Sequence, residues 1–231
     1  MYCATISADV ISYTSLHKSE KRKLEQSVHQ LIDELEKLYK KENFFGRLLQ
    51  GDYIEFAMDT PTPSLRIALI LKAFVKSLSF DAEKKDKLRL RYFNEHGIRL
   101  AIAVAPLETF NPQEGIIDGE AIYLSGRTIK NFSTSNKQKI VIKNTMYFCS
   151  SNEKIRNEFD IILSLLDTIF TRFSAKQSEV IYFKLLGLSE KEIASKLHKY
   201  QSTISQHSTA AGWLSIEKAV NYFENYFQHA H

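Results

Sequence analysis

The sequence predicts a mixed α/β domain followed by an all-α module. Up to about residue 150, short apolar or β-branched runs alternate with amphipathic stretches of helical period, which is typical of an α/β or α+β fold. After about residue 173, helical periods and helix-capping signals follow one another without strand signals. We therefore expect an α/β domain over 1–150, a helical connector over 151–173 and a helical domain over 174–231.

The composition is that of a folded protein and excludes several other classes. Of the 231 residues, 44% are hydrophobic and 25% charged, with 8 glycines and 4 prolines, which excludes a disordered or collagen-like chain. The 31 basic and 27 acidic residues give a formal net charge of +4, which permits nucleic-acid binding without demanding it. Two cysteines cannot form a dense disulfide framework, and no apolar run is long enough to span a membrane. We expect a cytoplasmic protein with no membrane partner.

The first domain is expected to begin with a strand, a long helix and a hairpin. The small, β-branched run over 2–11 predicts a buried strand. Over 20–41 apolar residues recur at helical spacing, and over 44–58 two strand-like stretches flank Gly51 and Asp52, a pair suited to a tight turn. The residues expected on the buried face of the helix are Leu24, Val28, Leu31, Ile32, Leu35 and Leu38.

The rest of this domain adds alternating helices and strands. The run over 98–105 is apolar almost throughout, which predicts a central strand covered on both sides. The resulting order βαββαβαβ is that of an α/β (α+β) sandwich of ferredoxin-like or palm type, with helices on one face of a mostly antiparallel sheet. The elements expected are a helix over 64–79 with Ser64 as N-cap, a strand over 98–105, a loop over 107–119, a helix over 120–132 and a strand over 139–143.

The C-terminal domain carries the strongest local pattern in the chain. Ser174 is expected to cap a first helix. Ser189 and Glu192 have the capping-box spacing for a second, short helix that ends at Leu197. A turn over 198–201 separates this helix from a third one. Three helices in this arrangement predict a helix-turn-helix.

The run from Leu188 to Leu197, followed by Gln201 to His207, resembles the helix-turn-helix of bacterial regulators and of sigma-factor region four. The resemblance implies a recognition helix in the major groove of double-stranded DNA, where Gln pairs with adenine and Ser or Thr hydroxyls reach phosphates or bases. No Lys or Arg occurs over 200–216, so phosphate contacts must come from Lys191, Lys196, Lys199 or another surface. The residues expected to bind DNA are Lys199, Gln201, Ser202, Thr203, Ser205 and Gln206. The alternative is a helical module that binds another protein.

Two aspartates in the first domain are candidate metal ligands. Asp9 ends the first predicted strand, and Asp52 lies in the hairpin turn. Pairing of that strand with the hairpin would bring both carboxylates to one edge of the sheet, where two hard oxygen ligands can hold Mg²⁺ and a nucleoside triphosphate. The alternative is that Asp52 serves only the turn and Asp9 only caps the helix that follows.

The first domain also resembles class III nucleotidyl cyclase catalytic domains over about 1–145. The resemblance rests, in order along the chain, on the run Asp9 to Thr14, the Gly51-Asp52 turn, the strand over 97–103 and the run over 119–127. With the helix-turn-helix attached, and the run over 210–213 beyond it, the layout is similar to that of the bacterial SatD family.

The resemblance implies a role for each matching residue. Asp9 and Asp52 match the metal ligands, and Arg127 matches the catalytic arginine that stabilises charge in the transition state. The backbone amides after Asp9 match the triphosphate cradle. The candidate nucleotide-binding residues are therefore Ser12, Tyr13 and Thr14, joined by Arg47, which lies beside the position that selects the base.

Three positions depart from the cyclase pattern. Leu48 replaces the lysine that selects the purine, Ile116 replaces the partner of that lysine, with Asp118 nearby, and Tyr123 replaces an asparagine. Metal and phosphate positions match while base selection does not, which favours binding over turnover.

We therefore expect a DNA-binding transcriptional regulator whose first domain forms a homodimer and senses a nucleotide. Two alternatives stay open, a metal-dependent nucleotidyl cyclase and a non-enzymatic dimer whose helical tail binds protein.

Overall fold

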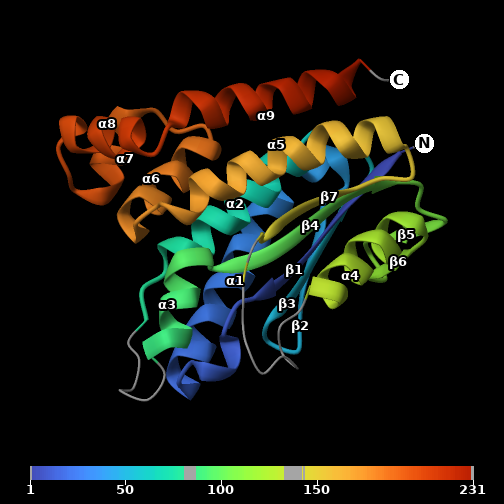
Figure 1. Ribbon diagram of the computed structural model, residues 1–231, viewed down its shortest axis with the longest axis horizontal. Helices are drawn as coiled ribbons and strands as arrows, with labels where there is room; N and C mark the ends of the chain where they lie inside the picture. Colours follow the sequence, from blue (N-terminus) through green and yellow to red (C-terminus); the bar gives the residue numbers. More distant parts are fainter. Residues whose placement is uncertain (1, 81–86, 133–141, 143, 230–231) are drawn as a thin grey trace.

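The structure, a computed structural model, describes residues 2–80, 87–132, 142 and 144–229 (Figure 1). These residues form a mixed α/β fold, so the predicted class is confirmed at this level. A five-stranded sheet lies in the middle, and helices from the last third of the chain pack along one side of it (Figure 1). In the part of the chain that the structure describes, no helix combines the length and the apolar character needed to cross a membrane.

The sheet is built from β1 (Cys3–Val10), β2 (Phe45–Leu49), β3 (Tyr53–Met58), β4 (Ile98–Ala105) and β7 (Met146–Cys149). Its strand order is β2-β3-β1-β4-β7, and all neighbours are antiparallel except β4 and β7. β1 is central, with Ile6 opposite Phe56 on one side and Ile102 on the other. Every residue of β4 is buried, which confirms the prediction of a covered central strand.

One face of the sheet is covered by α1 (Lys18–Leu38) and α2 (Ser64–Ser77). Their apolar residues form one core with Ala4, Ile6, Ala8 and Val10 of β1. The predicted buried face of α1 is confirmed except at Leu38, which is 56% exposed because the helix ends there. Two short 3₁₀ turns flank α1, at Tyr13–Ser15 and Lys40–Glu42.

The start of α2 differs from the prediction. Pro63 is the N-cap and Ser64 is already helical, and the Ser64 hydroxyl donates back to the Pro61 carbonyl oxygen at 2.7 Å. The predicted Ser64 cap is therefore wrong, because this hydroxyl binds the preceding turn and not a free amide of the helix.

The opposite face of the sheet is covered by α4 (Glu120–Phe132). Ser125 of α4 meets the hydroxyls of Thr5 and Ser7 on β1 at 3.0 and 2.9 Å. The prediction that helices lie on one face is therefore wrong for α4. The physical reason is the parallel pairing of β4 and β7, since parallel neighbours need a crossover connection and α4 supplies it.

Further elements lie between α2 and α4. The predicted loop over 107–119 contains the hairpin of β5 (Thr109–Asn111) and β6 (Ile116–Asp118). A helix, α3 (Lys87–His96), precedes β4. The predicted strand over 139–143 lies outside the described residues except for residue 142, which is not in a strand.

The C-terminal helices are α5 (Glu153–Thr171), α6 (Ala175–Leu185), α7 (Glu190–Leu197), α8 (Gln201–Ala210) and α9 (Trp213–Gln228). α5 packs on β7, and α5 and α9 run side by side (Figure 1). Their core is continuous with that of the sheet. The Phe159 ring of α5 lies 5.3 Å from Phe148 of β7 and 4.8 Å from Phe223 of α9, measured between ring centroids.

Candidate functional site

The two predicted metal ligands lie on neighbouring strands at one end of the sheet. Asp9 of β1 is opposite Tyr53 of β3, and Asp52 immediately precedes Tyr53. The Val10 amide donates to the Asp52 carbonyl oxygen at 3.0 Å, which joins the two backbones. The Asp52 charge also contributes to the pKa of Asp9. The structure therefore brings the two aspartates together.

Asp9 is paired with a buried arginine of β4. The Nη1 atom of Arg99, whose side chain is 2% exposed, lies 3.0 Å from Oδ2 and 3.3 Å from Oδ1 of Asp9. Burial raises the pKa of Asp9 to about 6; the Arg99 charge opposes this shift and the Asp52 charge adds to it. Burial also raises the pKa of Asp52. Carboxyl groups that hold their protons this strongly are common at functional sites.

The backbone after Asp9 forms a tight turn that includes the predicted phosphate-binding residues. Ser12 has a left-handed conformation with φ 61°. The amides of Ser15 and Leu16 donate to the carbonyl oxygens of Ser12 and Tyr13, each at 3.0 Å, so both amides are used inside the turn. The amides at the start of such a turn have no partner within it, which leaves those of Tyr13 and Thr14 at the position that the cyclase resemblance assigns to phosphate.

The Tyr13 side chain packs between α1 and the turn that carries Asp52. Its hydroxyl donates to Oε1 of Glu25 on α1 at 2.5 Å. A Cβ atom on Gly51 would overlap the Tyr13 hydroxyl and lie 2.8 Å from Glu25 Oε1. Gly51 also has φ 82°, a conformation that favours glycine. Tyr13 and Glu25 therefore pack against the turn that carries Asp52.

A lysine that the sequence analysis did not single out lies beside this turn. The Nζ atom of Lys21, on the first turns of α1, is 3.5 Å from the Thr14 carbonyl oxygen and 5.0 Å from the centroid of the Tyr13 ring. Its charge lowers the pKa of Asp52 against the effect of burial. Lys21 is half-buried, and together with Arg99 it is a residue that sequence reasoning missed at this site.

Arg47 is joined to other groups. Its Nε atom donates to Glu55 Oε2 at 2.7 Å, and its Nη1 atom donates to the Gly115 carbonyl oxygen at 2.9 Å. Glu55 lies directly opposite Arg47 in the β2–β3 register. The guanidinium predicted to bind a nucleotide base therefore ties the edge strand to the β5–β6 hairpin.

Arg127 is not brought to the aspartates within one chain. It is exposed on α4, whereas Ser125 on the same helix is buried against the sheet. The Arg127 guanidinium carbon lies 5.7 Å from the centroid of the Tyr123 ring, and the Tyr123 hydroxyl donates to Asp118. The predicted catalytic arginine thus lies on the side of α4 that is turned away from the sheet.

The aspartate pair fits Mg²⁺ in donor type and would supply only part of a coordination shell. Carboxylate oxygens are ligands that Mg²⁺ prefers, and protein-bound Mg²⁺ usually keeps waters and substrate phosphates as its other ligands. In the described ranges, no group of three or more His, Cys, Asp or Glu side chains is placed to hold a metal ion. Asp9 and Asp52 would therefore hold Mg²⁺ together with a polyphosphate, not in a cage made by the protein alone.

The second candidate site lies on α7 and α8. Ser189 and Glu192 form the predicted capping box at the start of α7, with Ser189 N–H donating to Glu192 Oε2 at 2.8 Å. The turn between the two helices is made by His198, which takes the left-handed conformation with φ 52° in place of a glycine. α8 then begins at Gln201, one residue earlier than predicted. A small separate core joins α6, α7 and α8, formed by Val180, Ile193, Ala194 and Ile204.

The predicted DNA-binding residues form the outer side of α8 and of the turn before it. Gln201, Ser202 and Gln206 are exposed, and Thr203 and Ser205 are half-buried. In the turn before α8, three more residues are exposed: His198, Lys199 and Tyr200, which is 83% exposed.

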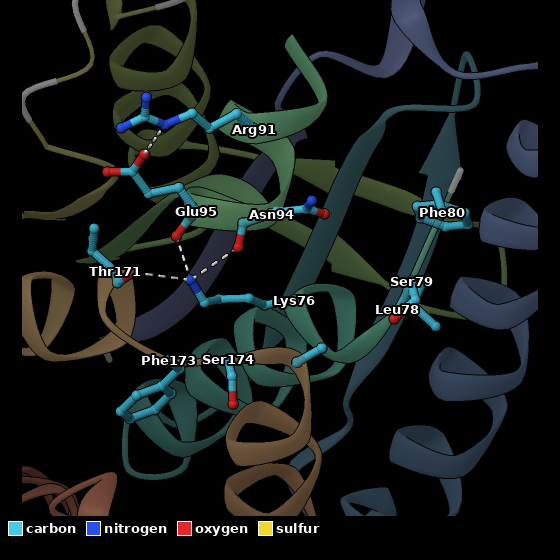
Figure 2. Close-up of a pocket in the computed structure, with 11 residues that line it drawn as sticks. Lys76, Leu78, Ser79, Phe80, Arg91, Asn94, Glu95, Thr171, Phe173 and Ser174 are labelled. Carbon is cyan, nitrogen blue, oxygen red and sulfur yellow. Dashed lines mark hydrogen bonds and ion pairs between the residues drawn. The ribbon is translucent and has the colours of Figure 1, made fainter. Parts of the chain in front are cut away.

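A cavity of about 440 Å³ lies between α2, α3 and the junction of α5 with α6. Figure 2 shows Lys76 at this cavity, donating to the carbonyl oxygens of Asn94, Glu95 and Thr171. Asn94 and Glu95 lie at the C-terminal end of α3 and Thr171 at that of α5, where free carbonyl groups attract a cation. Burial lowers the pKa of Lys76 to about 8. All three ammonium hydrogens are used on helix ends, so Lys76 caps two helices and has no hydrogen left for a ligand.

No family model, curated protein or solved structure matches this chain.

Proposed function

We propose that the protein is a DNA-binding transcriptional regulator of SatD-like type, in which a cyclase-like domain senses a nucleotide and a helix-turn-helix reads DNA. The observation that carries the DNA proposal is the contrast between the two sides of α8. Ile204 is 1% exposed in the three-helix core, whereas Gln201, Ser202 and Gln206 are exposed to solvent. Short polar side chains on an exposed helix are suited to contact base edges in the major groove.

We propose that the DNA-binding form is a cytoplasmic homodimer, and the low charge of α8 favours the dimer over a monomer. Each phosphate that a protein neutralises contributes to affinity through counterion release, and α8 carries no Lys or Arg. Two copies that bind two half-sites would double the base contacts and the contribution of Lys199. We therefore expect a shallow dependence of affinity on salt.

The first prediction concerns base recognition. Gln201→Ala or Gln206→Ala should weaken binding to a selected duplex by about 1–3 kcal/mol and leave binding to a scrambled duplex nearly unchanged, because each removes base contacts. Lys199→Ala should weaken both equally. Gln228→Ala is the matched control, since Gln228 is exposed near the end of α9. Fluorescence anisotropy at two salt concentrations measures all four variants.

Two results would contradict this proposal. Equal losses on both duplexes from the glutamine variants would mean that α8 does not read bases. Failure of the wild-type protein to bind any duplex at low salt would favour the alternative in which the helical module binds protein.

Nucleotide sensing is the second part of the proposal, supported by the meeting of Asp9 and Asp52. The order β2-β3-β1-β4, with α1 after β1 and α2 after β3, also supports the ferredoxin-like, cyclase-like interpretation of the sheet. The positions of Arg47 and Arg127 support binding over turnover. The metal-dependent cyclase is the alternative, which release of pyrophosphate from a nucleoside triphosphate would favour.

The second prediction concerns Mg²⁺ and pH. A metal ion binds the deprotonated carboxylate, and the pKa of Asp9 is about 6, so protons compete with Mg²⁺ below this pH. Affinity for Mg²⁺ with nucleoside triphosphate should rise by about tenfold per pH unit up to pH 6 and level off above it. Asp9→Asn should remove both the binding and its pH dependence. Asp33→Asn, at an exposed position of α1, is the control. Calorimetric titration between pH 5 and pH 8 gives the affinities, and a flat profile would contradict Asp9 as a ligand.

A further inference from the structure

Lys21 is a cation that contacts the turn after β1 and whose charge acts on Asp52. Its Nζ atom has a long contact of 3.5 Å with the Thr14 carbonyl oxygen and lies over the Tyr13 ring. A bond of this length to a neutral oxygen contributes little, so hydrogens of the ammonium remain for a stronger acceptor. Lys21 is half-buried, and its stem is fixed on the first turns of a 21-residue helix.

The charges at this end of the sheet call for such a cation. The two aspartates carry two negative charges when ionised, which would repel a polyphosphate. One bound Mg²⁺ together with Arg99 more than balances the two carboxylates but leaves most of the negative charge of a triphosphate unbalanced. Arg99 is 2% exposed and already paired with Asp9, so its guanidinium is used inside the protein. Lys21 is half-buried, unlike the fully buried Arg99, and contacts the 12–16 turn at the Thr14 carbonyl oxygen and the Tyr13 ring.

We propose that Lys21 binds the polyphosphate of a nucleoside triphosphate that is held with Mg²⁺ at Asp9 and Asp52. This inference rests on the proposed nucleotide binding and adds the residue that recognises the phosphates. Charge-assisted hydrogen bonds from an ammonium to phosphate oxygens are the recognition chemistry, and this chemistry depends on the number of phosphates and not on the base.

The test uses inorganic triphosphate, which carries the charges of a nucleotide without a base. Titration of the full chain with Mg²⁺ and inorganic triphosphate is compared for wild type, Lys21→Gln, Lys21→Arg and the control Lys23→Gln. The Lys23 Nζ atom lies 6.0 Å from the Phe80 ring centroid. Lys21→Gln should lower the affinity by roughly 10- to 100-fold, because a hydrogen bond to a charged group is lost. Lys21→Arg should retain most of the affinity, and Lys23→Gln all of it.

Measuring the affinity for Mg²⁺ without triphosphate shows whether Lys21 recognises phosphate or only supports the local structure. Lys21 repels a cation at Asp52, so Lys21→Gln should bind Mg²⁺ as well as wild type or more tightly, while it binds triphosphate more weakly. A variant that has merely lost its local structure would lose both. Unchanged triphosphate affinity in Lys21→Gln would overturn this inference and leave nucleotide binding intact. Absence of binding of inorganic triphosphate, ATP and GTP to wild type would overturn both proposals.

Discussion

Asp167→Leu should destabilise the protein by about 3–5 kcal/mol, because it leaves a buried ammonium without its carboxylate. The Nζ atom of Lys72 on α2 lies 3.3 Å from Oδ1 of Asp167 on α5, and the two side chains are 1% and 6% exposed. Asp167 also accepts hydrogen bonds from the amide and the hydroxyl of Thr145, both at 2.5 Å. Removal of Asp167 therefore leaves the amide and the hydroxyl of Thr145 without their acceptor, and it leaves the Lys72 ammonium with neutral acceptors only, the carbonyl oxygens of His96 and Ile98 and the Thr145 hydroxyl.

A double-mutant comparison isolates the charge. Lys72→Met with Asp167→Leu removes both ions, so the double variant should lose less stability than Asp167→Leu alone, since no unpaired charge remains. Urea unfolding of the two single variants and the double variant gives the free energies. Burial lowers the pKa of Lys72 and the Asp167 charge opposes that shift. A loss below about 1 kcal/mol in Asp167→Leu would contradict this prediction.

The burial of two lysines on α2 could not be predicted from the sequence. Lys72 and Lys76 interrupt an apolar run, and such residues ordinarily mark a solvent-facing side of a helix. Both are buried here, because the ends of α3 and α5 supply carbonyl acceptors from distant parts of the chain. The partners of a buried charge are set by tertiary packing and have no local signal.

The elements that could be predicted are those with local signals. The strand over 98–105 and the helix over 120–132 have the predicted bounds, and the Ser189–Glu192 capping box forms as expected, because periodicity and capping act over a few residues. β7 has four residues and pairs with β4 in parallel, a long-range contact without a local signature. The position of α4 on the second face depends on that pairing and is missed for the same reason.

The candidate site also has residues that could be predicted from the sequence and residues that could not. Asp9 and Asp52 could be placed together from strand alternation and the hairpin turn. The pairing of Asp9 with Arg99 follows from the β1–β4 register, in which the two residues are opposite, and no pattern in the sequence fixes that register. Lys21 lies on a charged helix face where lysines are usually solvated, so its nearness to Asp52 appears only once the helix is packed.

Phe223→Ala should destabilise the whole protein by about 3–5 kcal/mol, because Phe223 belongs to the core that the sheet and the C-terminal helices share. Its side chain is fully buried. Its ring centroid lies 4.8 Å from that of Phe159, 6.1 Å from that of Phe148 on β7 and 4.7 Å from that of Phe227. Leu214→Ala on the same helix is the control, since Leu214 is 71% exposed and should change stability by about 0.5 kcal/mol or less.

Two probes of unfolding determine whether the C-terminal helices form an independent domain. Trp213, the single tryptophan of the chain, lies at the start of α9 and reports on these helices by fluorescence, whereas far-ultraviolet circular dichroism reports on the whole protein. With a shared core, the two transitions should coincide in wild type and move together to lower urea in Phe223→Ala. If the fluorescence transition moved alone and the dichroism transition split in two, residues 174–231 would unfold by themselves. A shared core would connect the proposed nucleotide site at Asp9 and Asp52 to α8 through packed side chains, whereas an independent domain would require a signal that passes along α5.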